Sequence, residues 1–355
     1  MGPLRTPICD LFGVRYPIVQ TGMGFVAGPR LVAATANAGA LGILAGATMS
    51  HPELAAAIRD TRERTDAPFG VNLRADAPDA GRLVDLLIRE KVRVASFALA
   101  PGRELVARLK GAGVAVVPSI GARRHAEKVA AWGVDAVVVQ GAEGGGHTGP
   151  VPTTLLLPQV VDAVDIPVIA AGGFFDGRGL VAALAYGAAG IAMGTRFLLT
   201  SDSPVGEEVK RRYLAATVTD TVVTDALDGL PQRLLRSPFV DAIVRSGRTG
   251  RLLRSVRSAA AFRRLSGTGW RELAREGLAM RRTRELAWSQ VLLAANTPVL
   301  LKAAMVDGRP DLGVLATGQV AGLIEDLPTC AELVARIMDG AAAVLDRLAG
   351  TEVPW

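Results

Sequence analysis

Three histidines are the candidates for proton transfer near neutral pH, and one of them stands in a setting that suits catalysis. His147 ends the run QGAEGGGH (140–147), whose three consecutive glycines allow the chain to pass close to a flat ligand. An imidazole with its ordinary pKa of about 6.5 is suited to general acid–base chemistry. The alternative is that His147 only hydrogen-bonds carbonyls of its own loop. His51, in a helix-capping motif, and His125, among basic residues on the polar face of an expected helix, are expected at the solvated surface.

Metal-dependent and hydrolytic chemistries are poorly supported. The sequence has no HxH or HExxH spacing, and Ser119, Ser201 and Ser203 lack a pattern that suggests a catalytic triad. Cys9 and Cys330 lie near opposite ends without CxxC spacing, which indicates a reducing compartment. No run of about 18 uninterrupted apolar residues is present. We therefore expect a cytoplasmic protein with a small-molecule substrate and without a metal or membrane partner.

Two glycine signals follow consecutive apolar runs and suit the binding of a phosphate. Gly172 and Gly173 end the run IPVIAAGG (166–173), and Gly194 and Thr195 follow GIAM (190–193). Glycine lets the backbone approach an anion and turn its N–H groups toward it, and a following helix adds its positive end. Each glycine alone would be read as a tight turn. Two sets at the ends of consecutive strands favour a phosphate site.

A third glycine cluster imitates a dinucleotide-binding fingerprint. Gly22, Gly24 and Gly28 follow an apolar run, but the next run, ALGILAG (40–46), ends without the acidic residue that would bind a ribose. This interpretation also leaves the repeating pattern of the chain unexplained. We therefore set a Rossmann fold aside.

These residues are spaced by a rhythm of short apolar runs, turns and helix-period segments. Eight such runs alternate with helical patterns, which predicts a (β/α)8 (TIM) barrel, an α/β fold. The predicted strands are 17–20, 40–44, 69–73, 92–99, 114–120, 135–140, 166–173 and 190–197. In such a barrel the loops after strands six, seven and eight meet at one mouth, so His147 and the glycine turns would lie together.

The rhythm stops after Phe197. We expect a TIM barrel over 1–205, a smaller, mainly helical and Arg-rich substrate or lid region over 206–294 inserted after strand eight, and helices over 295–355 that complete the barrel. Between Pro231 and Arg284 there are 14 Arg against three acids, in a chain whose net charge is only +6. No nucleic-acid motif or interleaved aromatic platform accompanies these arginines, so we do not expect a nucleic-acid partner.

Several motifs in combination resemble one flavoprotein family over nearly the whole chain. They are PIVQTGMG (17–24), FGVN (69–72), VVVQGAEGGGHTG (137–149), PVIAAGGFFDGRG (167–179), GAAGIAMGTRF (187–197) and TGQVAGLI (317–324). The set is similar to the nitronate monooxygenase (2-nitropropane dioxygenase) family and its enoyl-acyl-carrier-protein reductase II relatives. The resemblance implies an FMN cofactor whose phosphate contacts Gly172, Gly173, Gly194 and Thr195.

The same resemblance assigns the remaining positions around the flavin. It implies that Gly22, Met23 and Gly24 line the ring through backbone atoms, that Asn72 reaches the ring or ribityl chain, and that Gln140 binds ribityl hydroxyls. His147 would be the active-site histidine, and Gln319 the glutamine near the flavin face.

Within the family, the chain most resembles an actinobacterial branch with a flavin dehydrogenase of steroid-ring breakdown that acts on a ring-bearing acyl-CoA. That implies hydride transfer on an acyl-CoA, proton transfer by His147, and NAD(P) as a candidate electron partner. The phosphates of CoA would suit Arg251, Arg254 and Arg257, although these residues could equally form solvated basic helices. The alternatives are a nitronate monooxygenase that uses O2, and a non-catalytic barrel that binds a phosphate ligand. A homo-oligomer is left open.

Overall fold

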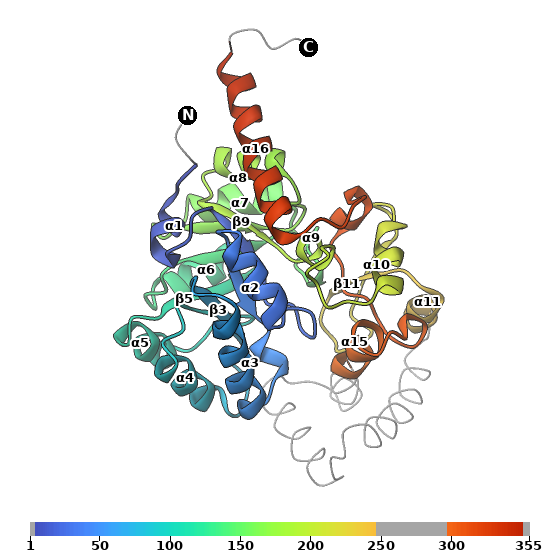
Figure 1. Cartoon of the computed structure of the whole chain (residues 1–355), viewed down its shortest axis with the longest axis horizontal. Helices are drawn as coiled ribbons and strands as arrows, with labels where there is room; N and C mark the ends of the chain where they lie inside the picture. The colour runs from blue at the N-terminus through green and yellow to red at the C-terminus, as the bar shows by residue number, and fades with distance from the viewer. Residues whose placement is uncertain (1–3, 246–296, 351–355) are drawn as a thin grey trace.

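The computed structural model describes residues 4–245 and 297–350, and eight parallel strands close into a barrel at its centre (Figure 1). Each barrel strand pairs with the next barrel strand, so that β6 pairs with β8, and β9 returns to pair with β1. The barrel strands are β1 (Ile18–Gln20), β2 (Leu41–Leu44), β3 (Phe69–Leu73), β4 (Val94–Phe97), β5 (Ala115–Ile120), β6 (Val137–Gln140), β8 (Val168–Ala171) and β9 (Gly190–Met193). All eight lie within the predicted apolar runs, so the predicted (β/α)8 barrel is confirmed.

Alternating side chains divide the core of the barrel into an inner and an outer part. Val19, Ile43 and Val138 belong to a buried cluster that also contains Ile8 and Phe12 of α1 (Pro7–Phe12). Because every second residue of a strand points to the same face, this cluster fills the interior of the barrel, with α1 packed against one end. The interior is a packed core and leaves the mouth as the place for chemistry.

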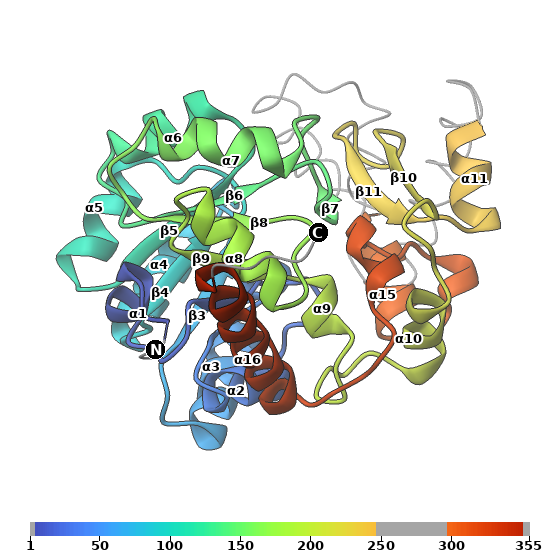
Figure 2. The same cartoon turned by 90° about the horizontal axis from the view of Figure 1, so that it is seen from above.

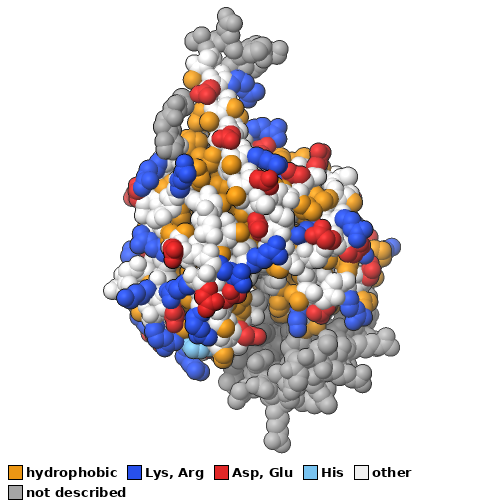
Figure 3. Space-filling view, in the orientation of Figure 1, with side chains coloured by type: hydrophobic (Ala, Val, Ile, Leu, Met, Phe, Trp, Pro, Cys, Tyr) orange, Lys and Arg blue, Asp and Glu red, His pale blue; other side chains and the backbone are white. Residues whose placement is uncertain are grey.

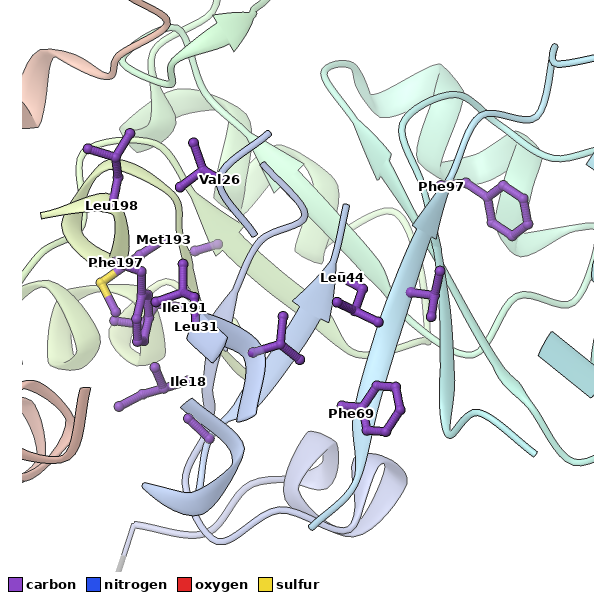
Figure 4. Close-up of a cluster of buried hydrophobic side chains, with 14 of the residues drawn as sticks. Ile18, Val26, Leu31, Leu44, Phe69, Phe97, Ile191, Met193, Phe197 and Leu198 are labelled. Carbon is purple, nitrogen blue, oxygen red and sulfur yellow. The ribbon is translucent and has the colours of Figure 1, made fainter. Parts of the chain in front are cut away.

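The outer part lies between the barrel and its helices. Ile18, Leu44, Phe69, Phe97 and Met193 belong to a second buried cluster, part of which is drawn in Figure 4. The helices that follow the strands in turn are α2 (Pro29–Asn37), α3 (His51–Arg64), α4 (Ala80–Arg89), α5 (Arg103–Gly111), α6 (Arg123–Ala130), α7 (Thr153–Val161) and α8 (Gly177–Ala185). The predicted capping box at the start of α3 is present, with the Ser50 N–H donating to Glu53 at 2.7 Å.

The eighth helix of the ring comes from the end of the described chain. Helix α16 (Cys330–Ala349) packs against α8 and α2 and runs on beyond the barrel (Figures 1 and 2). A Cβ on Gly177 of α8 would lie 2.5 Å from the carbonyl carbon of Gly340 and 2.6 Å from the oxygen of Ile337. Glycine is therefore needed where the two helices cross.

A smaller unit lies beside the barrel between β9 and α16 (Figure 2). It contains α9 (Thr195–Leu198), α10 (Glu207–Leu214), β10 (Thr221–Thr224), β11 (Gln232–Leu235), α11 (Pro238–Arg245), α15 (Thr297–Met305), and the short 3-10 turns η2 (Pro310–Leu312) and η3 (Gln319–Leu323). Strands β10 and β11 form an antiparallel pair, and β11 also pairs with the short strand β7 (Gly146–His147). The sequence pattern predicts helices here, and the sheet is an addition that the pattern does not indicate. Arg251, Arg254 and Arg257 lie outside the described residues.

Charged side chains of both signs are mixed on the face of the molecule shown in Figure 3. Basic residues on that face do not gather into one continuous stripe of the kind that follows a nucleic-acid backbone. Among the helices of the described ranges, none has both the length and the apolar character needed to cross a bilayer.

Candidate active site

Polar side chains stand at the carboxyl ends of neighbouring strands, inside the barrel mouth. Asn72 of β3 and Ser96 of β4 are paired in register, and the Asn72 amide donates to the Ser96 hydroxyl at 3.4 Å. The alternation that places Val94 in the inner cluster also places Ser96 inward, and in the same way Ser119 of β5 and Gln140 of β6 follow inner-cluster residues. Ser96 was not anticipated, although its two-residue spacing from Val94 would have indicated its direction.

The two predicted glycine turns are neighbours in space. Ala171 of β8 pairs with Ala192 of β9, so the residues that follow these two strands emerge side by side. Gly172 and Gly173 adopt φ values of +96° and +86°, which L side chains rarely adopt. Outside the barrel ladder, none of the hydrogen bonds among the described residues uses the main-chain N–H of Gly173, Gly194 or Thr195. These three donors at the mouth match what an anionic oxygen needs.

The loop after β1 lies against both of these features. A Cβ on Gly22 would overlap the Cβ of Asn72, and one on Gly194 would lie 3.4 Å from the sulfur of Met23. A Cβ on Gly24 would lie 2.9 Å from the Thr48 methyl group. These glycines therefore have a packing reason to be glycine, and they also bring backbone atoms to the mouth of the barrel.

The glycine-rich loop after β6 passes between two other segments of the site. A Cβ on Gly144 would lie 2.6 Å from the side-chain nitrogen of Gln140, and one on Gly145 would lie 2.6 Å from the backbone nitrogen of Gly318. Gln140 donates through Nε2 to the carbonyl of His147 at 2.8 Å. The loop therefore contacts the end of β6 on one side and the segment before η3 on the other.

Further hydrogen bonds join the η3 segment to the glycine-rich loop after β6 and to the turn after β9. The Gln319 backbone N–H donates to the Glu143 carbonyl at 3.0 Å, and the Gly318 N–H donates to the Thr195 hydroxyl at 3.0 Å. The Glu143 carboxylate accepts the Thr153 hydroxyl at 2.8 Å. The side-chain amide of Gln319 points elsewhere, toward the carbonyl of Val218 at 3.5 Å. The structure therefore places Gln319 at the site through its backbone.

His147 is held by a carboxylate from the smaller unit. Its Nε2 lies 2.8 Å from Oδ2 of Asp228, which belongs to the connection between β10 and β11. The His147 side chain is 55% exposed and that of Asp228 only 11%. Burial alone would raise the pKa of Asp228, but hydrogen bonding to His147 and to the Leu230 N–H outweighs burial, so the pKa lies below its ordinary value.

Asp228 could not be identified as a site residue from the sequence. It stands 81 residues from His147 and in no motif, so only the pairing of β7 with β11 makes the two neighbours. The same is true of Arg233 of β11. This mostly buried guanidinium donates to the Ala142 carbonyl at 2.8 Å and supports the loop from beneath, and burial lowers its pKa. His51 begins α3 and His125 lies on α6, and His125 is exposed.

Across residues 4–245 and 297–350 no group of three or more His, Cys, Asp or Glu side chains is arranged to hold a metal ion. The arrangement offers instead three features. The glycine turns at 172–173 and 194–195 form an anion cradle, and inward-facing polar side chains of β3 to β6 form a polar row inside the mouth. The accessible imidazole of His147 is paired with the carboxylate of Asp228. Such a set can hold a phosphate-bearing cofactor and move one proton beside it.

Comparisons with known proteins agree with this geometry. The family described as "Nitronate monooxygenase" matches residues 5–83 and 80–340. The "(3aS,4S,5R,7aS)-5-hydroxy-7a-methyl-1-oxo-octahydro-1H-indene-4-carboxyl-CoA dehydrogenase" of Mycobacterium tuberculosis is 64% identical over 338 residues, which is 94% of this chain and 95% of the relative. The Rhodococcus jostii protein of the same name is 60% identical over 348 residues, 98% of this chain and 99% of that protein. The structure of FabK from Thermotoga maritima superposes with a TM-score of 0.80 at 34% identity, covering 98% of this chain and 99% of that one.

Proposed function

The chain belongs to the nitronate monooxygenase family of flavin-dependent oxidoreductases, and we propose that it uses FMN to transfer hydride on a ring-bearing acyl-CoA thioester. The observation that carries the proposal is the identity of 60% or more, over almost the full length, with two dehydrogenases named for a bicyclic carboxyl-CoA. The matched stretch covers almost the whole chain and therefore includes the loops that build the mouth, where specificity resides.

The residues at the mouth fit a flavin mononucleotide. Backbone N–H groups of the two turns, at Gly172, Gly173, Gly194 and Thr195, would bind its phosphate. The loop over 22–24 would line the ring, with Asn72 and Gln140 within the same polar row, and Gln319 at its edge. A bound FMN would supply the two-electron chemistry that no protein side chain offers.

The chain's own contribution to the reaction is proton transfer. His147 is accessible at the mouth, and its loop is fixed to Gln140 and to the η3 segment, so the ring has a defined place. We assign it the proton that leaves or enters the substrate when hydride moves. General acid–base catalysis of this kind contributes about 10²–10⁴ in rate.

The arginines at 251, 254 and 257 are proposed to contact the phosphates of CoA. The proposal rests on their forked donors and on their density in the sequence, because they lie outside the described residues. NAD(P) is proposed as the partner that receives the electrons.

A spectroscopic titration tests the function. The purified protein is expected to show flavin absorbance, to release FMN on denaturation, and to change its spectrum when the bicyclic carboxyl-CoA is added. The free carboxylic acid without CoA is the matched control and is expected to bind far more weakly. Reduction of NAD+ or NADP+ by the complete system identifies the electron partner.

The same experiment separates the alternatives. Rapid oxygen uptake with propionate-3-nitronate or 2-nitropropane, together with no response to acyl-CoA, would establish a nitronate monooxygenase instead. Protein that is colourless and takes up no FMN would favour a non-catalytic phosphate-binding barrel.

A further inference from the structure

In the hydrogen bond between His147 and Asp228, the chemistry of the two groups decides which one donates. An ionised carboxylate can only accept hydrogen bonds, and a neutral imidazole carries its single proton on one of two nitrogens. Because Asp228 faces Nε2 at 2.8 Å, the favourable arrangement places the proton on Nε2 and leaves a lone pair on Nδ1.

We propose that Asp228 is a positioning residue that fixes His147 in the Nε2–H form, so that Nδ1 is the atom that exchanges a proton with the substrate. The inference rests on the proposed function in taking His147 as the proton-transfer group. Within the described ranges Nδ1 has no hydrogen-bond partner, and the ring is more than half exposed.

Asp228 is built to hold this position. Its second oxygen, Oδ1, accepts the N–H of Leu230 at 3.1 Å, so the carboxylate is anchored to its own turn. Strand β11 then pairs Gln232 with His147, which fixes the turn relative to the histidine. The carboxylate is therefore oriented by the backbone before any ligand binds.

The other charged groups near the pair are occupied elsewhere. The Glu143 carboxylate is bound by Thr153, and the Arg233 guanidinium binds the Ala142 carbonyl and the Thr221 hydroxyl. In the part of the chain that the structure describes, Asp228 is thus the carboxylate that contacts the ring. The pKa of Asp228 lies below its ordinary value, so the group stays ionised through the neutral range.

In the reaction, Asp228 would stabilise the positive charge that His147 acquires when it takes a proton from the substrate. When the substrate loses a proton to Nδ1, both ring nitrogens carry hydrogen and the ring becomes positive. The Asp228 carboxylate then faces that charge. An asparagine at 228 would keep the shape of the side chain, but it would lose the charge and could either donate to Nε2 or accept from it.

A direct test measures which ring nitrogen carries the proton. Long-range proton–nitrogen NMR spectra of the purified protein, with isotopically labelled histidine, distinguish the two tautomers. The chain has only three histidines, and His147→Gln identifies the signal. We expect the Nε2–H form for His147 in the unsubstituted protein, and loss of that preference in Asp228→Asn. An Nδ1–H form, or an unchanged preference in the variant, would overturn the proposal.

Kinetics supply the second readout. Asp228→Asn is expected to bind FMN normally and to lower kcat about 10- to 100-fold with little change in KM, because a neutral hydrogen bond replaces the charge-assisted one that faces the positive ring. Asp228→Glu keeps a carboxylate and should recover part of the loss. Asp307→Asn removes an exposed carboxylate of the same unit and is the matched control, with kcat unchanged. A kcat of Asp228→Asn close to that of the unsubstituted protein would contradict the positioning role.

The two proposals fail separately. If acyl-CoA leaves the flavin spectrum unchanged, the proposed substrate is wrong, while the tautomer of His147 is still measured without any substrate. If Asp228→Asn does not fold, the tautomer in the unsubstituted protein alone decides the inference.

Discussion

Replacing Gly173 by alanine tests the anion cradle without touching a functional side chain. Gly173 lies just after β8 with φ at +86°, and its backbone N–H donates to no acceptor among the loop and turn hydrogen bonds of the described ranges. A Cβ built there meets only the Cβ of Glu143, at 3.7 Å. The protein itself therefore has room for the added methyl group.

Two separate costs follow from this geometry. The left-handed backbone is disfavoured for alanine by about 1–2 kcal/mol, which lowers the free energy of unfolding. If a phosphate occupies the space in front of the turn, the methyl group and any shift in φ also weaken a hydrogen bond to a charged group. Such a bond is worth about 1.5–3 kcal/mol, so the dissociation constant of FMN is expected to rise roughly 10- to 100-fold.

Gly133→Ala is the matched control. Gly133 has nearly the same φ, +83°, nothing within 4 Å of an added Cβ, and a place beyond α6 outside the site. Both variants should lose similar stability in urea unfolding of the FMN-free protein, whereas only Gly173→Ala should lose FMN affinity in a fluorescence titration. Equal FMN affinity in Gly173→Ala and the unsubstituted protein would show that the cradle does not hold the phosphate.

Three further outcomes are expected. His147→Gln should keep its flavin absorbance and lose about 100-fold or more of its turnover number; near-normal turnover would remove His147 from the reaction. Gly177→Ala should lower the free energy of unfolding by about 1–3 kcal/mol, because the methyl group would press on the backbone of α16, and an unchanged urea midpoint would contradict that contact. The pKa of Asp228 is lowered in the folded protein, so its stabilising effect is complete above the ordinary carboxyl pKa and is lost as the pH falls through the lowered value. The melting-temperature advantage over Asp228→Asn should accordingly shrink below about pH 4, and an advantage that does not change with pH would refute this reasoning.

The barrel could be predicted because its signals are local. A parallel strand buried on both faces needs a continuous apolar run, such as FGVNL at 69–73, and each run is followed by its own helix. The capping box at Ser50 and the glycine turn at 172–173 are likewise set by residues next to each other in the chain. The position of His147 after the sixth strand followed from the same local rhythm.

The β10–β11 pair could not be predicted from local sequence signals. TVVT at 221–224 is short and partly exposed, and QRLL at 232–235 is fully buried although it carries a glutamine and an arginine. The polar residues are tolerated inside because the fold supplies partners, including the Ala142 carbonyl for Arg233. The residues of 232–235 do not by themselves indicate which groups elsewhere in the chain will bind them.

The sequence by itself therefore determined the eight-stranded barrel, the turns at its mouth and the histidine loop, since hydrophobic period and turn chemistry act over a few residues. Tertiary structure alone decided that Asp228 meets His147, that Asn72 meets Ser96, and that α16 crosses α8 at Gly177. Each of these contacts joins segments brought together by strand register and helix packing, and those depend on the whole folded chain.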